Sequence, residues 1–225
     1  MTAQTRTRIK MCGFTREADV DAAVHAGADA VGFVLYDKSP RFVSAERAGQ
    51  LAARLPAFVT PVLLFVNASS DEVAAASAQV PGATLQFHGD ESAEFCAQVA
   101  QRCQRPFLRV ARIPQNPAAS FDLVKFAQDN LHAQALLLDT LVDGYGGSGQ
   151  SFNWSLLPPN VNAHLVLSGG LTPANVADGI RLLRPRARSL AVDVSSGIEA
   201  GKGLKDAAKI QHFVAAVRAA DNMLS

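Results

Sequence analysis

The chain has 225 residues, 48% of them hydrophobic, and its 21 Lys and Arg nearly balance its 20 Asp and Glu, which gives a formal net charge of +1. A chain of this length and apolar content can bury one large core, and it suits a single α/β barrel better than a typical sandwich. The near-neutral charge argues against a protein of nucleic acids or of membrane surfaces, so we expect neither as a partner.

The N-terminus and the cysteines indicate the compartment. The first eight residues, MTAQTRTR, are polar and contain no apolar run of the kind that a signal peptide needs. The apolar run VTPVLLFV (59–66) is too short to span a bilayer. Cys12, Cys96 and Cys103 form no close pair beside histidines, so we expect free thiols and no metal site. These features predict a cytoplasmic protein.

Eight short apolar runs recur along the chain, with helical periodicity between them. Several runs are nearly continuous in Val, Leu and Phe, as expected for parallel strands that are buried on both faces. In chain order they are IKMCG (9–13), AVGFVL (30–35), PVLLFV (61–66), TLQFHG (84–89), FLRVARI (107–113), ALLLDT (135–140), HLVLSGG (164–170) and LAVDVSSG (190–197).

The segments between these runs predict amphipathic helices, because apolar residues recur at i, i+3, i+4 and i+7 within 48–55, 176–183 and 210–217. Ser69 with Glu72 fits a capping box, and Thr172 before Pro173 predicts another helix start. The segment GYGGSGQSFNWSLLPPN (144–160), after the sixth run, is mostly loop. Loops of that length inside a compact domain are usually functional.

Eight strands that alternate with helices predict a (β/α)₈ TIM barrel, which we expect to form a single catalytic domain over residues 1–225. An open doubly wound sheet is the alternative. No G-x-G-x-x-G motif follows the first strand, which disfavours the dinucleotide-binding form of that sheet. Because the active sites of such barrels lie at the carboxyl ends of the strands, the residues that follow each strand are the candidates.

The loops after the seventh and eighth strands predict a phosphate site. Their small residues allow the backbone to approach an anion, so that backbone N–H groups can donate to phosphate oxygens. Loops at these two positions are a frequent phosphate site in this fold. Plain turn chemistry is the alternative, since glycine is common in such loops. The candidate residues are Ser168, Gly169, Gly170, Ser195, Ser196 and Gly197.

Asp139 and Cys12 are candidates for acid–base chemistry. Asp139 follows the apolar run ALLL, where lost solvation favours a neutral general acid, although such a carboxylate can also be a cap. Cys12 ends the first strand and shares strand parity with Lys10, so both should face the barrel interior. There the ammonium would favour the thiolate and place the pKa of Cys12 below its reference of about 8.5. A small buried core cysteine is the alternative.

Four further polar residues follow strands. Arg41, in SPR (39–41), has a planar guanidinium that can pair bidentately with a carboxylate or a phosphate, unless it is an ordinary surface arginine. His88 is either a catalytic imidazole or a hydrogen-bonded histidine of the barrel wall, and the same alternatives apply to Gln86. Asp193 precedes the Ser-Ser-Gly loop, where it either contributes to the site or braces the loops.

Together these residues resemble the phosphoribosylanthranilate isomerase family of tryptophan biosynthesis. The matching motifs occur in the order of the family, from the first strand to the eighth, and are specific as a set although each is weak alone. They are KMCG (10–13), SPR (39–41), QFHG (86–89), LLLD (136–139), GGSGQSFNW (146–154), SGGL (168–171) and DVSSGIE (193–199).

The resemblance implies an Amadori rearrangement of N-(5-phosphoribosyl)anthranilate on a (β/α)₈ barrel, without metal or cofactor. It implies that Cys12 is the general base, that Asp139 is the general acid and that Arg41 contacts the anthranilate. It also implies that the SGGL and SSG segments bind the phosphate. It does not specify whether the chain is a monomer or a homodimer. Departures from the usual motifs are Phe87, Ser148 and Asn153, and none is a proposed acid or base.

Two alternatives remain open. Another sugar-phosphate isomerase or lyase on the same barrel would share the phosphate loops, but the related isomerase of histidine synthesis is expected to have aspartate at position 12, where this chain has Cys12. A phosphate-binding protein without catalysis would not need both Cys12 and Asp139.

Overall fold

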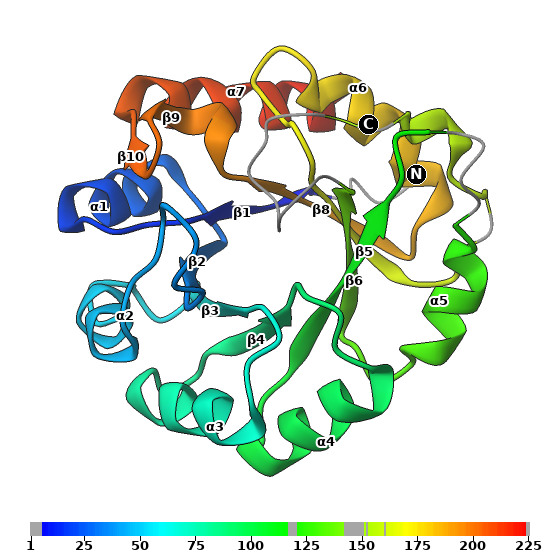
Figure 1. Ribbon diagram of the computed structural model, residues 1–225. Helices are drawn as coiled ribbons and strands as arrows, with labels where there is room; N and C mark the ends of the chain where they lie inside the picture. The colour runs from blue at the N-terminus through cyan, green and yellow to red at the C-terminus, as the bar shows by residue number, and fades with distance from the viewer. Residues whose placement is uncertain (1–5, 117–120, 142–150, 152, 160, 224–225) are drawn as a thin grey trace.

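A computed structural model of the chain describes residues 6–116, 121–141, 151, 153–159 and 161–223. Eight parallel strands form a closed barrel in sequence order, with β8 paired to β1. Figure 1 shows the helices arranged around the outside of the strands, with α7 between α6 and α1. The predicted (β/α)₈ TIM barrel is therefore confirmed.

All eight predicted runs form strands. They are β1 (Arg8–Cys12), β2 (Ala30–Val34), β3 (Thr60–Phe65), β4 (Thr84–Phe87), β5 (Phe107–Ile113), β6 (Ala135–Thr140), β7 (His164–Leu167) and β8 (Ser189–Val194). The helices are α1 (Glu17–Ala26), α2 (Ala45–Ala52), α3 (Ser70–Gln79), α4 (Ala93–Cys103), α5 (Leu123–Asp129), α6 (Val176–Leu183) and α7 (Ala207–Met223). A short hairpin, β9 (Glu199–Gly201) and β10 (Leu204–Lys205), lies between β8 and α7.

The helix-start predictions had mixed outcomes. The capping box of Ser69 and Glu72 is present at α3. The start predicted at Thr172 is wrong, because α6 begins at Val176 and its N-cap is Asn175. Residues 172–175 form a turn in which the Asn175 side-chain oxygen accepts a 2.8 Å hydrogen bond from the Thr172 N–H. Because this turn occupies residues 172–175, the helix begins only after Asn175.

The loop predicted after the sixth strand lies largely outside the described residues. Its glycine-rich part falls within 142–150, which includes Ser148. In the described part, one 3₁₀ turn, Trp154–Leu156, begins after Asn153, whose side chain accepts a hydrogen bond from the Ser155 N–H.

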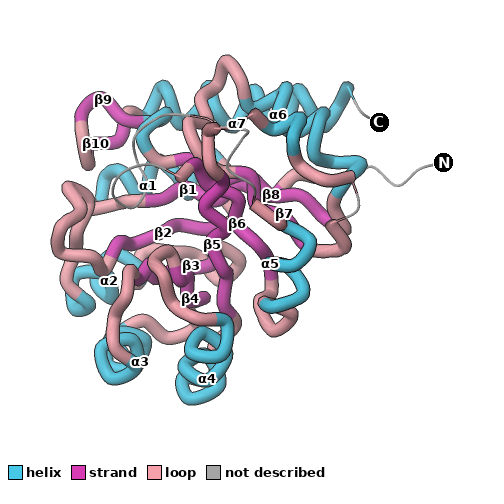
Figure 2. Tube along the Cα trace, turned by 45° about the vertical axis from the view of Figure 1, so that its right-hand side comes forward, coloured by secondary structure: helices cyan, strands magenta, loops and turns pink. Residues whose placement is uncertain are grey.

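Side-chain alternation divides the core into two layers. One large cluster fills the space between strands and helices, where Ile9 and Met11 of β1 are fully buried. Smaller clusters lie on the opposite strand faces, one around Cys12 and one around Val110, Leu137 and Val166. Figure 2 shows the strands enclosed by the helical ring in a second view. This alternation allows apolar residues to pack against the helices while polar residues of the same strands face the barrel interior.

A buried carboxylate joins the two ends of the fold. Asp221 of α7 accepts hydrogen bonds from the Thr7 N–H at 3.0 Å and from the Thr7 hydroxyl at 2.6 Å, just before β1 begins. Arg184 and Arg218 also contact this carboxylate. Burial disfavours the charged form of Asp221, but the hydrogen bonds from Thr7 and Arg184 outweigh it and lower the pKa of Asp221.

Loss of this carboxylate should destabilise the whole barrel. We expect Asp221→Ala to lower the free energy of unfolding by roughly 2–3 kcal/mol near neutral pH, because buried donors lose a charged acceptor. Since the folded-state pKa of Asp221 is lowered, its stabilisation is present above the unfolded value of about 3.9 and disappears as the pH falls through the folded value. Urea unfolding at several pH values measures the difference.

The matched control is Asp129→Ala, which breaks the exposed Lys125–Asp129 pair and should change stability by less than about 1 kcal/mol. Equal effects of the two variants, or a difference that does not shrink in acid, would contradict the role of Asp221.

Candidate active site

Ionisable and polar side chains collect inside the barrel at the carboxyl ends of its strands. All six of the main ones are at most 6% exposed: Lys10, Cys12, Gln86, His88, Asp139 and Asp193. Burying polar groups costs free energy, and a dense set of them at one end of a barrel is typical of a functional site. Its position is the one where (β/α)₈ barrels have their active sites.

Cys12 occupies a small apolar recess. Its neighbours in the interior cluster are Val34, Leu64 and Val66. Gly32 is directly opposite on β2, and a Cβ atom at that position would lie 2.7 Å from the Cys12 sulfur. The glycine within the otherwise bulky run AVGFV is therefore explained by the space that the sulfur needs.

Lys10 lies beside Cys12, but it is shared with another partner. Its ammonium donates a 2.8 Å hydrogen bond to Asp193 of β8, which is also buried. Burial raises the pKa of the Cys12 thiol, and the opposing effects of Lys10 and Lys205 do not outweigh it. The predicted lowering of the Cys12 pKa is therefore wrong for the protein without ligand. An apolar recess and the nearby Asp193 carboxylate both disfavour the thiolate.

Asp139 is held at the end of β6 by two donors. Its Oδ1 accepts a 2.9 Å hydrogen bond from the Thr140 N–H, and its Oδ2 lies 3.0 Å from His88 Nε2. The His88 ring in turn contacts Gln86. Asp139 therefore has a defined orientation at the barrel mouth, and both of its contacts lie within the barrel rather than at the start of a described helix.

The two predicted phosphate loops pack directly against each other. A Cβ atom at Gly197 would overlap the carbonyl oxygen of Leu171, so only glycine allows this approach. Gly169 and Gly170 have positive φ angles of 79° and 63°, and Gly169 faces Asp139 and Thr140 closely. The structure thus brings together the loops after β7 and β8 and places one of them beside the proposed acid.

Arg41 is buried, and so it is not an ordinary surface arginine. Its Nε and Nη2 donate hydrogen bonds of 2.7 and 2.8 Å to the two carboxylate oxygens of Glu199. Lys205 contacts the same carboxylate at 2.8 Å and also donates to the Ser195 carbonyl. Burial raises the pKa of Glu199, but Arg41 and Lys205 outweigh it and the net shift is downward.

Sequence reasoning missed Glu199 and Lys205 as members of the site. Glu199 stands within the quoted SSGIE motif, and Lys205 follows only six residues later. Neither position has a strand or helix periodicity that predicts burial of a charge. Their burial depends on the β9–β10 hairpin, which folds back beside Phe14 and places the Lys205 ammonium 5.3 Å from that ring.

The three cysteines are free thiols. Among the described residues, no group of three or more His, Cys, Asp or Glu side chains could hold a metal ion. Within the same residues, no helix is both long and apolar enough to cross a membrane.

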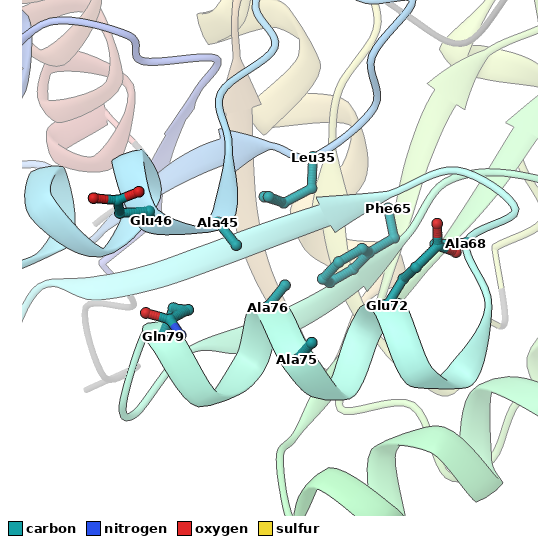
Figure 3. Close-up of a pocket in the computed structure, with 9 residues that line it drawn as sticks. All are labelled: Leu35, Ala45, Glu46, Phe65, Ala68, Glu72, Ala75, Ala76 and Gln79. Atoms are coloured by element: carbon teal, nitrogen blue, oxygen red, sulfur yellow. The ribbon is translucent and has the colours of Figure 1, made fainter.

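A separate groove lies on the outside of the barrel. It measures about 530 Å³ and is lined by α2, α3 and the carboxyl ends of β2 and β3. Figure 3 shows Leu35 and Phe65 at its base, with Glu72, Ala76 and Gln79 along α3. None of the predicted site residues lines it.

A closed parallel barrel whose buried ionisable groups meet at the carboxyl ends of its strands defines a (β/α)₈-barrel enzyme. Comparison with known proteins specifies the family. A family model described as N-(5'phosphoribosyl)anthranilate (PRA) isomerase matches residues 9–216. A protein of that description from Methylibium petroleiphilum is 59% identical over 216 residues, which cover 96% of each chain.

Solved structures agree. The chain is similar to phosphoribosyl anthranilate isomerase from Thermotoga maritima, with a TM-score of 0.82, 38% identity and coverage of 95% of this chain and 99% of that one. Another structure from that organism is of monomers generated from a dimeric isomerase (TM-score 0.78, 34% identity, coverage 94% and 98%). A third isomerase structure contains reduced 1-(o-carboxyphenylamino)-1-deoxyribulose 5-phosphate (TM-score 0.79, 35% identity, coverage 95% and 99%).

The chain therefore belongs to the N-(5'-phosphoribosyl)anthranilate isomerase family. As a member of that family it is an isomerase of tryptophan biosynthesis.

The contact of Gly32 with Cys12 predicts an effect on activity. Gly32→Ala should displace the sulfur and lower kcat/KM for phosphoribosylanthranilate by roughly 100-fold, the effect of a misplacement of about 1 Å. The melting temperature should fall only modestly, because overpacking costs about 1–3 kcal/mol. Gly201→Ala is the control, since its added Cβ would meet open space. If Gly32→Ala kept wild-type kcat/KM, the recess would not position the sulfur.

Proposed function

We propose that the protein converts N-(5-phosphoribosyl)anthranilate to 1-(2-carboxyphenylamino)-1-deoxyribulose 5-phosphate, with Cys12 as general base and Asp139 as general acid in one catalytic domain over residues 1–225. The observation that carries this proposal is their placement: Cys12 from β1 and Asp139 from β6 are both buried at one barrel mouth. The ligand reported for a related isomerase is the reduced form of this product.

The acid step opens the sugar ring. Asp139 gives its proton to the ribose ring oxygen, the C1–O bond breaks, and the nitrogen lone pair forms a C=N bond. The result is a protonated Schiff base and an Asp139 carboxylate. That carboxylate already has donors in the Thr140 N–H and His88, so the charge that develops on Asp139 is met by groups that need not move.

The base step uses the Schiff base as an electron sink. The Cys12 thiolate takes the proton from C2, and the C–H electrons form a C1=C2 bond as the iminium nitrogen is neutralised. The resulting enolamine then tautomerises to the ketose. In the free protein the thiol form of Cys12 is favoured by burial. Lys10 and Lys205 both favour the thiolate, and a bound iminium cation adds a further positive charge.

We assign Arg41 to the anthranilate carboxylate. Arg41 and Lys205 face the single carboxylate of Glu199, so this cluster has one positive charge in excess when Lys205 is protonated. An anionic ligand would restore the balance. Glu199 accepts from the Nε–H and from one N–H of Nη2 of Arg41, which leaves the second Nη2–H and both Nη1–H groups for the ligand carboxylate.

We assign the phosphate to the loops at 168–171 and 195–197. The candidate ligands are the backbone N–H groups of Gly169, Gly170, Ser195, Ser196 and Gly197. The Ser195 hydroxyl donates to the Cys12 carbonyl at 3.0 Å, which connects the phosphate loop to the proposed base. Asp193 would act indirectly, through the Lys10 ammonium that it holds beside Cys12.

Removing either proton-transfer group should lower turnover severely without unfolding the barrel. We expect both Cys12→Ser and Asp139→Asn to lower kcat by roughly 10²–10⁴, the usual contribution of general acid–base catalysis. Both variants should still bind a reduced product analogue. The measurement is the loss of anthranilate-type fluorescence from freshly made substrate, with calorimetry for analogue binding.

The pH dependence follows from the direction of the Cys12 shift. Because the pKa of Cys12 is raised and the base must be deprotonated, kcat/KM should still increase with pH above the reference value of about 8.5.

Normal turnover by Cys12→Ser would contradict the base role, and normal turnover by Asp139→Asn would contradict the acid role.

The phosphate assignment predicts that inorganic phosphate competes with substrate. Gly197→Ala should separate the two loops, because its Cβ would overlap the Leu171 carbonyl oxygen. We expect KM and the inhibition constant for phosphate to rise roughly tenfold or more, the loss of about one charge-assisted hydrogen bond, with kcat less affected. Gly201→Ala again serves as the control. Non-competitive inhibition, or an unchanged phosphate constant in Gly197→Ala, would count against these loops.

A further inference from the structure

Three buried side chains form a line that ends at the proposed acid. Gln86 Nε2 lies 3.1 Å from His88 Nδ1, and His88 Nε2 lies 3.0 Å from Asp139 Oδ2. Gln86 is completely buried, and His88 and Asp139 are each 6% exposed. Since Gln86 and His88 are two residues apart at the end of β4, alternation directs both toward the interior.

The orientation of the Gln86 amide determines which nitrogen of His88 carries the proton. An amide nitrogen can only donate, so His88 Nδ1 must accept and must lack a proton. A neutral His88 then carries its proton on Nε2 and donates it to the Asp139 carboxylate. If the amide were turned, its oxygen would require a proton on Nδ1. A neutral ring would then present its Nε2 lone pair to Asp139, whose proton would point at His88 and away from the substrate, whereas an imidazolium would donate to both partners.

We propose that Gln86 and His88 are positioning residues for the acid step, and that Gln86 keeps the catalytic proton on Asp139 by preventing His88 from becoming an imidazolium. This inference rests on the proposed acid role of Asp139. An imidazolium would carry a proton on both ring nitrogens, and the Nδ1 proton would face the Gln86 N–H group. The one proton that His88 and Asp139 could exchange is therefore held by Asp139, from which it can reach the substrate.

The proton balance is simple. Before ring opening, Asp139 carries one proton on an oxygen lone pair that neither donor uses, and His88 is neutral. The proton then moves to the ring oxygen as the C1–O bond breaks. Asp139 becomes a carboxylate that still accepts from His88 Nε2–H and Thr140 N–H. His88 gains and loses no proton in this step.

The amide oxygen of Gln86 supports a role beyond packing. Among the described residues, no hydrogen-bond donor reaches Gln86 Oε1, although this atom is buried. An amide with an unpaired buried oxygen is costly, and an apolar side chain of similar size would avoid that cost. The Nε2 contact to His88 is thus the interaction that explains an amide at this position.

Other ionisable groups at this end of the barrel include Cys12 and Lys10, which is paired with Asp193. The neighbouring strands present Leu64 and Leu108 in register with Gln86. Gly169 approaches Asp139 from the loop after β7. The charged groups on the adjacent elements are Arg112, in register with Asp139 and paired with Asp90, and Glu91, paired with Arg109. All of these groups are retained in the variants below, so changes in pH dependence can be attributed to Gln86, His88 and Asp139.

The test combines nitrogen NMR of the histidine rings with kinetics. The His88 signals are identified as those that are missing from the spectrum of His88→Gln. In the wild type they should show a proton on Nε2 and none on Nδ1 near neutral pH. Gln86→Met should release the ring into a mixture of protonation forms. It should lower kcat roughly tenfold or more with little change in KM, and shift the kcat–pH profile.

Variants of His88 separate hydrogen bonding from packing. His88→Gln supplies an amide N–H near the former Nε2 position and should keep kcat within about fivefold of wild type. His88→Met removes the donor and should lower kcat by roughly 10–100-fold, the loss of one hydrogen bond to a charged group. Asn130→Leu is the matched control, because Asn130 is another buried amide with an unpaired oxygen and lies outside the site. It should change stability only.

The outcomes are distinct. A wild-type His88 with its proton on Nδ1, or one that is an imidazolium at neutral pH, would overturn the inference regardless of turnover. If Asp139→Asn is inactive while Gln86→Met and His88→Met keep wild-type kcat and pH profiles, the inference fails and the proposed function stands. Normal turnover by Asp139→Asn would overturn the acid role and this inference with it.

Discussion

The site depends on how β8 closes the barrel against β1. Lys10 and Asp193 are directly opposite in the register of these two strands, and their side chains form a buried 2.8 Å ion pair. A slip of one residue in either strand would turn its charge into the apolar layer under the helices and leave the other charge without its partner. The pair therefore opposes such a slip, and correct closure places Cys12 next to the loop at Ser195.

Charges inside the barrel are arranged in small neutralising groups that share cations with the site. Lys10 pairs with Asp193, while Arg41 and Lys205 share Glu199. Burial of a lone charge is prohibitive, so each cation needs an anion nearby, yet complete neutralisation would leave nothing to attract an anionic substrate. One shared carboxylate for two cations satisfies both demands. It also explains why Arg41 is already oriented before any ligand binds.

Glycines set the spacing of the reacting groups as much as the polar residues do. Gly32 makes room for the Cys12 sulfur, and Gly197 lets the loop after β8 touch the loop after β7. Such contacts leave no room for a Cβ atom, so a single methyl group would move a functional atom. The interior is close-packed, and it transmits such displacements because it cannot absorb them.

The sequence by itself determined the eight strands, the faces on which their residues lie and the position of the two small-residue loops, because these follow from local periodicity and turn chemistry. Tertiary structure alone decided which groups meet. Arg41 pairs with Glu199 across 158 residues, and His88 reaches Asp139 across 51. The Cys12 pKa was predicted in the wrong direction for the same reason. Strand parity showed that Lys10 faces the interior, but it could not show that Asp193 already holds the ammonium or that an apolar recess surrounds the thiol. Periodicity specifies a face, whereas desolvation and pairing depend on what the closed barrel places opposite it.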